Sequence, residues 1–101
     1  MTAERWNTLT IFEQMSNISG EVTRLIQNKQ AVDNGNTDKN YTDFYIKRIM
    51  DLIYLTLSDP KNQRRERELL DEFYEIERYI MGDVDADYIS DYWEQYTKAL
   101  G

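Results

Sequence analysis

Residues 83–94, with the sequence DVDADYISDYWE, place acidic side chains at the spacing of a calcium-binding loop. Positions 1, 3, 5 and 12 of such a loop would be Asp83, Asp85, Asp87 and Glu94. An EF-hand loop also needs glycine at its sixth position, and here that residue is Tyr88. Acidic residues are also favoured at the start of a helix, where they cap free N–H groups. We therefore expect an acidic helix start, with these four carboxylates as calcium candidates in the lesser alternative.

A short basic cluster precedes the acidic part of the chain, and it suggests either RNA binding or internal ion pairs. It consists of Lys61, Arg64, Arg65 and Arg67. Basic clusters of this kind contact phosphate backbones, but Arg64 and Arg67 also lie four residues before Glu68 and Asp71. The net charge is −7, and residues 71–94 hold nine acids and one base. Because such an acidic surface repels nucleic acid, we favour internal pairing.

The residue types that most enzymes use for catalysis are missing. The chain contains no cysteine and no histidine, so it lacks the commonest general base, the commonest transition-metal ligand and any thiolate. A di-metal centre inside a helical bundle needs Glu-x-x-His pairs, which cannot be made. We therefore expect no cofactor and no enzymatic activity.

The stretch from Asp59 to Gly82 predicts a helix over residues 60–81. Asp59 is a favourable N-cap, Pro60 fits the first helical position, and Gly82 can adopt the left-handed conformation that ends a helix. Between them an apolar stripe recurs every three to four residues, and it consists of Leu69, Phe73, Ile76 and Ile80, with Leu70 beside it. A helix with one apolar stripe needs partner helices.

Three further helices are predicted, at residues 11–31, 41–58 and 86–100. Thr10 and Glu13 form a capping box before the first of them, Asn40 or Thr42 caps the second, and Asp85 caps the last. Residues 33–40 form the longest loop. We expect an all-α fold, a single-domain antiparallel four-helix bundle covering residues 1–101. The alternative is a less regular bundle that shares its second helix with another subunit.

Two features of these helices leave alternatives open. Residues 41–58 form the most apolar helix, which is therefore either the most buried helix or part of an interface. Gly20 stands in the middle of the first helix, either as an exposed weak position or as a point of close backbone approach.

Aromatic and acidic side chains supply the candidates for a partner-binding surface. The chain has eight tyrosines, and tyrosine is enriched at interfaces because it buries a large area at a small entropy cost. Tyr54, Tyr74 and Tyr79 lie near the edges of their apolar stripes. The acidic candidates are Glu72, Glu75, Asp87 and Asp91, which could imitate nucleic acid in the basic groove of a partner such as a nuclease.

The sequence contains no apolar segment long enough to cross a bilayer, and residues 1–8 do not resemble a secretion signal. We expect a cytoplasmic protein that has no membrane partner.

Three stretches resemble a loose group of small uncharacterised bacterial helical proteins. They are WNTLTIFEQMSNISGEVTRLI, LSDPKNQRRERELLDE and DVDADYISDYWEQYT, which together span most of the chain. The resemblance implies a compact helical domain. In outline the predicted bundle is also similar to HEPN-type domains, which often act in defence or toxin–antitoxin systems. The RNA-cleaving members carry an Arg-x4-6-His motif that a chain without histidine cannot contain.

The function that these features favour is a small acidic interaction module, which could regulate a nuclease or a defence system and whose partner is another protein, a second copy included. The alternative is an RNA-associated helical domain that uses Lys47, Arg48 and the basic cluster. An enzyme with carboxylates around a divalent metal is the third hypothesis.

Overall fold

The computed structural model describes the backbone of residues 2–100 and the side chains of residues 2–96. Every regular element in this part of the chain is helical. The elements are α1 (Ala3–Asn7), α2 (Ile11–Asp33), α3 (Thr42–Ser58), the 3₁₀ helix η1 (Pro60–Arg65), α4 (Glu66–Ile80) and α5 (Ala86–Leu100). The all-α prediction is confirmed for the described residues.

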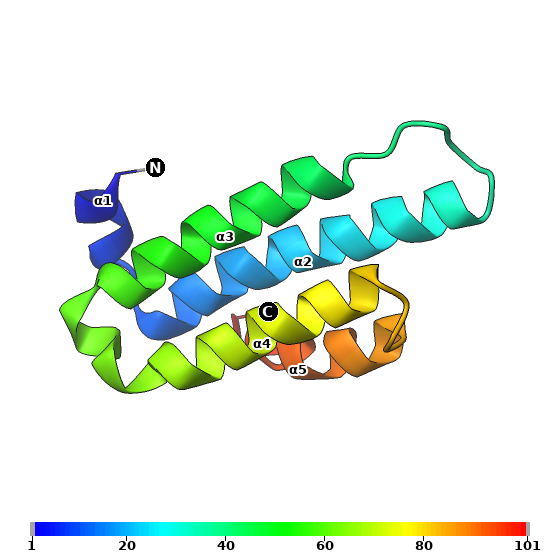
Figure 1. Cartoon of the computed structure of the whole chain (residues 1–101). Coiled ribbons are helices and arrows are strands. Elements are labelled where there is room, and N and C mark those ends of the chain that lie inside the picture. Colours follow the sequence, from blue (N-terminus) through cyan, green and yellow to red (C-terminus); the bar gives the residue numbers. More distant parts are fainter. Residues whose placement is uncertain (1, 101) are drawn as a thin grey trace.

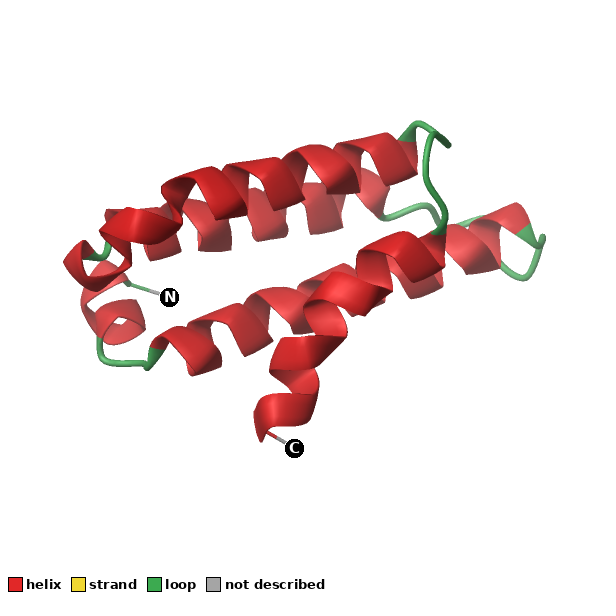
Figure 2. Ribbon diagram, turned by 90° about the horizontal axis from the view of Figure 1, so that it is seen from below, coloured by secondary structure: helices red, strands yellow, loops and turns green. Residues whose placement is uncertain are grey.

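The long helices form an elongated molecule measuring 42 × 25 × 23 Å. Helices α2 and α3 lie side by side and antiparallel, and α4 returns beneath them (Figure 1). Helix α5 packs against α2, and it runs obliquely to the other long helices (Figure 2). We call the end that holds α1 and η1 the hinge end, and the end that holds residues 34–41 and 81–85 the open end.

Three helix ends follow the local signals of the sequence, whereas the predicted N-cap of α3 at Asn40 or Thr42 is wrong, because Tyr41 holds that position and makes no side-chain cap hydrogen bond. Thr10 and Glu13 form the capping box, with Thr10 N–H donating to Glu13 Oε1 (2.9 Å) and Glu13 N–H to Thr10 Oγ1 (3.1 Å). Gly82 has a φ of 85°, and Asp83 N–H donates to the carbonyl of Arg78 (2.9 Å), which closes α4. Asp85 Oδ1 accepts the N–H of Tyr88 (2.9 Å) at the start of α5.

The core lies between α2, α3, α4 and α5, and one side chain of α1 closes it at the hinge end. That side chain is Trp6, which is fully buried. The core residues are Trp6, Met15, Ile18, Val22, Leu25, Ile26, Ile49, Ile53, Leu69, Ile76, Tyr79, Ile89, Trp93 and Tyr96. Burying so many large apolar side chains is the main stabilising term of the fold.

The single helix predicted over residues 60–81 is wrong in its first six residues, which form the 3₁₀ helix η1. Asp59 still caps this segment and Pro60 still occupies its start. A tertiary contact accompanies the 3₁₀ winding, because the amide of Asn62 donates inward to the carbonyl of Thr56 (2.9 Å) and to Gln14 Oε1 (2.8 Å). Sequence periodicity does not report such a contact.

Helix α3 is not the most buried helix, although it is the most apolar one. Its buried residues are Ile49, Ile53 and Thr56, whereas eight residues of α2 are buried. Phe44, Met50 and Tyr54 of α3 are exposed. The first alternative is therefore wrong, and the other one, that part of this helix forms an interface, stays a prediction.

Gly20 does not mark a close approach between backbones. A Cβ atom added there would meet only the side-chain nitrogen Nη1 of Arg24, at an ordinary distance of 3.8 Å. The glycine is a weak helix position and has no packing role.

Candidate interaction surface

A buried polar network holds the hinge end together and has a structural role. Trp6 Nε1 donates to Thr56 Oγ1 (3.0 Å), and Gln14 Nε2 donates to the carbonyl of Trp6 and to Asp59 Oδ2 (2.9 Å each). Asn62 then donates to Gln14 Oε1 (2.8 Å). Burial alone would raise the pKa of the Asp59 carboxyl, but hydrogen bonds from Lys61 and Gln14 outweigh it and hold the pKa below its usual value.

A second buried polar group, Glu21, joins α2 to α3. Its Oε1 accepts from Arg24 (3.0 Å) and from Arg48 (3.1 Å). Its Oε2 is also buried and has no hydrogen-bond partner among the described residues. The hydrogen bond to Glu21 and the charge of that carboxylate raise the pKa of Arg48. Only the Arg48 contact crosses from α2 to α3, because Arg24 lies on the same helix as Glu21.

Three acidic residues of α4, Glu68, Glu72 and Glu75, are partly buried. Tyr92 Oη donates to Glu68 Oε1 (2.5 Å), and burial together with this hydrogen bond raises the pKa of Tyr92. Burial, followed by the nearby carboxylates of Glu75, Glu68 and Asp71, raises the pKa of Glu72 to about 7. Glu75 pairs with Arg78 at 3.0 Å. The carboxylates of Glu68 and Glu75 therefore already have partners within the chain, and the raised pKa of Glu72 reduces its negative charge near neutral pH.

The four calcium candidates do not form a loop. Asp85 is the N-cap of α5, and Asp87 and Glu94 lie within that helix while Asp83 precedes it. Within residues 2–96, no three carboxylates gather in a way that could hold a metal ion. Helix formation from Ala86 onward accounts for this arrangement, because it separates Asp87 and Glu94 by two turns.

The basic cluster is divided by its contacts. Lys61 Nζ contacts Asp59 Oδ2 and donates to the carbonyl of Asn7 (3.2 Å), and Arg65 pairs with Glu68 at 3.4 Å. The expected pairs of Arg64 with Glu68 and Arg67 with Asp71 are not among the ion pairs of the described residues. The 3₁₀ winding explains the change for Arg64, because three residues per turn shift it away from Glu68.

The structure divides the partner-surface candidates into exposed and buried residues. Tyr54 and Tyr74 are 72% and 61% exposed, and Asp87 and Asp91 are exposed as well. Tyr79 is only 5% exposed and lies beneath the ammonium of Lys29, 5.3 Å from the ring centre. Its position in the core leaves little of its surface for a partner.

An open groove of about 430 Å³ runs between α3 and α4. Ile46 and Met50 line it from α3, and Phe73, Ile80 and Met81 line it from the α4 side. Two acids, Asp43 and Glu77, line it as well. The groove therefore combines five apolar side chains with two carboxylates.

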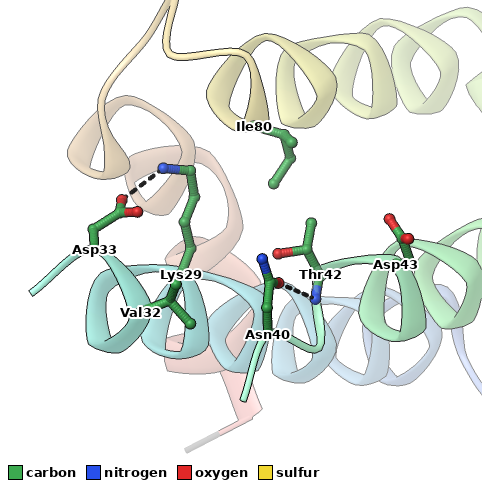
Figure 3. Close-up of a pocket in the computed structure, with 7 residues that line it drawn as sticks. All are labelled: Lys29, Val32, Asp33, Asn40, Thr42, Asp43 and Ile80. Atoms are coloured by element: carbon green, nitrogen blue, oxygen red, sulfur yellow. Dashed lines mark hydrogen bonds and ion pairs between the residues drawn. The ribbon is translucent and has the colours of Figure 1, made fainter. Parts of the chain in front are cut away.

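A polar pocket of about 480 Å³ continues the groove at the open end, and the two hollows share Thr42, Asp43 and Ile80. Lys29 and Asp33 form an ion pair at 2.8 Å on one side of this pocket, and Ile80 approaches from the other side (Figure 3). The amide oxygen of Asn40 accepts the N–H of Thr42 (3.0 Å) at its edge. The pocket offers charge and hydrogen bonds at the end of an apolar groove.

Three exposed apolar residues of α3 and of the α4 region are not among the partner-surface candidates that the sequence suggests. They are Met50, Leu70 and Met81, which are 51%, 49% and 74% exposed. For α4 the sequence does contain a sign of this exposure, because Leu70 and Tyr74 share a side of the helix that the stripe of Leu69 and Ile76 does not cover. For Met50 the wide apolar face of α3 concealed which part would be buried.

Comparison with family models, with curated proteins and with solved structures yields no match to this chain. The resemblance to small bacterial helical proteins and to HEPN-type domains therefore stays a hypothesis. No described helix combines the length and the apolar character that crossing a bilayer requires.

Proposed function

We propose that this chain is a small helical-bundle protein that binds another protein through the outer side of α3 and α4. We call this surface the α3–α4 face and define it by Met50, Tyr54, Leu70, Tyr74 and Met81. The observation that supports the proposal is the exposure of all five of these large apolar side chains, by between 49% and 74%. In the bundle that we propose, α2, α3 and α4 alternate in direction and α5 returns across α2.

The physical argument rests on the cost of leaving apolar area in water. Contiguous apolar patches larger than a few hundred Å² are uncommon on monomers and often mark binding surfaces. Tyrosine and methionine are enriched at protein interfaces, whereas lysine and glutamate are depleted there. The α3–α4 face also adjoins a groove, which provides the concave surface that a partner's side chains can fill.

The acidic side of the molecule supports nucleic-acid mimicry less strongly. Of its four candidate residues, Glu75 is paired with Arg78 and Glu72 has a pKa of about 7. Asp87 and Asp91 remain exposed on α5. For the RNA-associated alternative, Arg64 and Arg67 are basic side chains without an ion pair in the described part of the chain. Two arginines are few to overcome the repulsion between RNA phosphates and a protein with a net charge of −7.

Site-specific photo-crosslinking in the cell that produces the protein tests the proposal. A photoreactive phenylalanine derivative replaces Tyr54 of the α3–α4 face, which is 72% exposed, and a control carries it at Tyr88 of α5, which is 53% exposed. We expect a defined crosslinked protein from position 54 and none from position 88. The purified partner should then bind Tyr74→Glu at least tenfold more weakly than wild type, and Tyr88→Glu as tightly as wild type. Equal crosslinking at both positions, or unchanged affinity for Tyr74→Glu, would overturn the proposal.

A further inference from the structure

One exposed stripe of α4 has the spacing of a helix-pairing seam. The residues Arg67, Leu70, Tyr74, Glu77 and Met81 follow one another at intervals of three, four, three and four. All five are exposed, and none belongs to the core stripe on the opposite side of the helix. Intervals of three and four align side chains along one line of a helix, as at the contact positions of coiled coils. We call these five residues the outer seam of α4.

The order of side chains along the outer seam is self-complementary. It reads from a cation, Arg67, through two apolar residues, Leu70 and Tyr74, to an anion, Glu77. Reversing this order places the anion opposite the cation and each apolar residue opposite the other. A two-fold axis perpendicular to the helix reverses its direction relative to its copy and so performs this operation.

We infer that the α3–α4 face binds a second copy of this chain, with the two α4 helices antiparallel. This inference rests on the proposed function. The two-fold axis passes at the level of Glu72, midway between Arg67 and Glu77. Arg67 then lies opposite Glu77 of the second copy, and Leu70 lies opposite its Tyr74. The seam between the two charges spans about 15 Å along the helix.

The charges at the two ends of the seam favour this partner over an unrelated one. Within the described residues, neither Arg67 nor Glu77 takes part in an ion pair, although seven ion pairs form elsewhere in that part of the chain. Antiparallel pairing supplies both with a partner. Like charges at these positions would disfavour a parallel arrangement, because Arg67 would meet Arg67 and Glu77 would meet Glu77.

The surroundings of the seam differ in charge between its two ends. Arg64 and Arg67 line one shallow surface hollow toward the hinge end together with Leu70 and two acids, Glu66 and Asp71, so the charges of this hollow balance. Asp43 and Glu77 line the groove toward the open end, and none of the residues that line this groove is basic. The complementary charges of the antiparallel pair are therefore those of Arg67 and Glu77 themselves. Met50 of α3 lines the same groove as Glu77, so it widens the apolar centre of the interface.

Charge exchange with sedimentation-equilibrium measurement tests this inference. Wild type, Arg67→Glu and Glu77→Arg are compared from a few micromolar to about 0.5 mM, because small interfaces give micromolar dissociation constants. We expect wild type to dimerise and each single variant to weaken self-association at least tenfold. Tyr88→Glu on α5 is the control and should dimerise as wild type does.

Mixing the two single variants should restore dimers. The glutamate introduced at position 67 of one copy then meets the arginine introduced at position 77 of the other. The second contact of the mixed pair joins the unchanged Glu77 of the first copy to the unchanged Arg67 of the second. Both ends of the seam therefore carry opposite charges again.

Each outcome decides the inference. Weaker self-association of both single variants than of wild type, followed by restored association in the mixture, supports antiparallel pairing, because in a parallel pair the wild type and both single variants would all bring like charges together. A monomeric wild type at all concentrations, or single variants that dimerise normally, overturns it. Those results leave the proposed function to the crosslinking experiment, in which a different protein captured from position 54 would identify the face as a surface for another partner.

Discussion

Replacing Asn62 with alanine tests whether the polar network at the hinge end stabilises the fold. Asn62 is 2% exposed, and its amide donates to the Gln14 side chain (2.8 Å) and to the Thr56 carbonyl (2.9 Å). Asn62→Ala removes both hydrogen bonds at once. It also leaves Gln14 Oε1 buried without its donor. An unsatisfied buried polar atom destabilises the folded state by more than the net contribution of one hydrogen bond.

The expected loss can be estimated from these contacts. Two hydrogen bonds contribute about 1 kcal/mol each, and an unsatisfied buried oxygen costs a further 1 kcal/mol or more, which gives about 3 kcal/mol in total. A domain of this size has roughly 5–15 kcal/mol of stability. The loss should lower the midpoint of thermal unfolding by about 10–25 °C.

Urea unfolding provides the measurement, with the fluorescence of Trp6 and Trp93 as the signal, since both indoles are buried in the folded protein. Gln63→Ala is the matched control, because Gln63 is the exposed neighbour in the same 3₁₀ helix. We expect the control to change the free energy of unfolding by less than about 0.5 kcal/mol. If Asn62→Ala costs no more than Gln63→Ala at an unchanged urea dependence, the assignment of a stabilising role to the network is refuted.

Three further predictions concern single side chains. Glu72→Gln should raise the thermal midpoint at about pH 8 and leave it unchanged at about pH 4: the folded pKa is raised from 4.5 to about 7, so the contribution of Glu72 to stability is present at low pH and is lost as the pH rises through 7. Gly20→Ala should stabilise the protein by about 0.5–1 kcal/mol, whereas Gly82→Ala, at a φ of 85°, should destabilise it by about 1 kcal/mol; calorimetry that gives the two changes the same sign would contradict this. Tyr92→Phe removes the donor to Glu68 Oε1 (2.5 Å) and should cost about 1–2 kcal/mol in urea unfolding, and no loss would mean that the bond contributes nothing net.

Local signals in the sequence predicted most of the fold. Each of these signals acts on the backbone next to it. The side chains of Thr10, Glu13 and Asp59 bind free N–H groups at helix starts, and Gly82 adopts a positive φ because it has no side chain. Such signals need no knowledge of distant residues. The apolar stripes predicted which side of each helix faces the core, and Leu69 and Ile76 are fully buried as expected.

Contacts between distant residues could not be predicted in this way. Gln14 bonds to Asp59 and Asn62, which lie 45 and 48 residues away. The only local sign is that Gln14 stands three residues after Ile11 and four before Ile18, at a stripe position where an apolar residue is expected. Tyr79 was misplaced for the related reason that a residue at the edge of a stripe becomes buried or exposed according to the neighbouring helix, and Lys29 of α2 covers it.

The 3₁₀ helix connects the polar network to the proposed interaction surface. An α-helix turns about 100° per residue and a 3₁₀ helix about 120°, so six residues of η1 rotate the following helix by about 120° relative to a continuous α-helix. That rotation sets which side of α4 faces the core and which side carries Leu70 and Tyr74 outward. Asn62 holds this segment in place, so its loss should impair partner binding even under conditions where the variant remains folded. Measuring dimerisation of Asn62→Ala well below its unfolding midpoint tests this link, and wild-type association there would show that the face is oriented independently of the hinge.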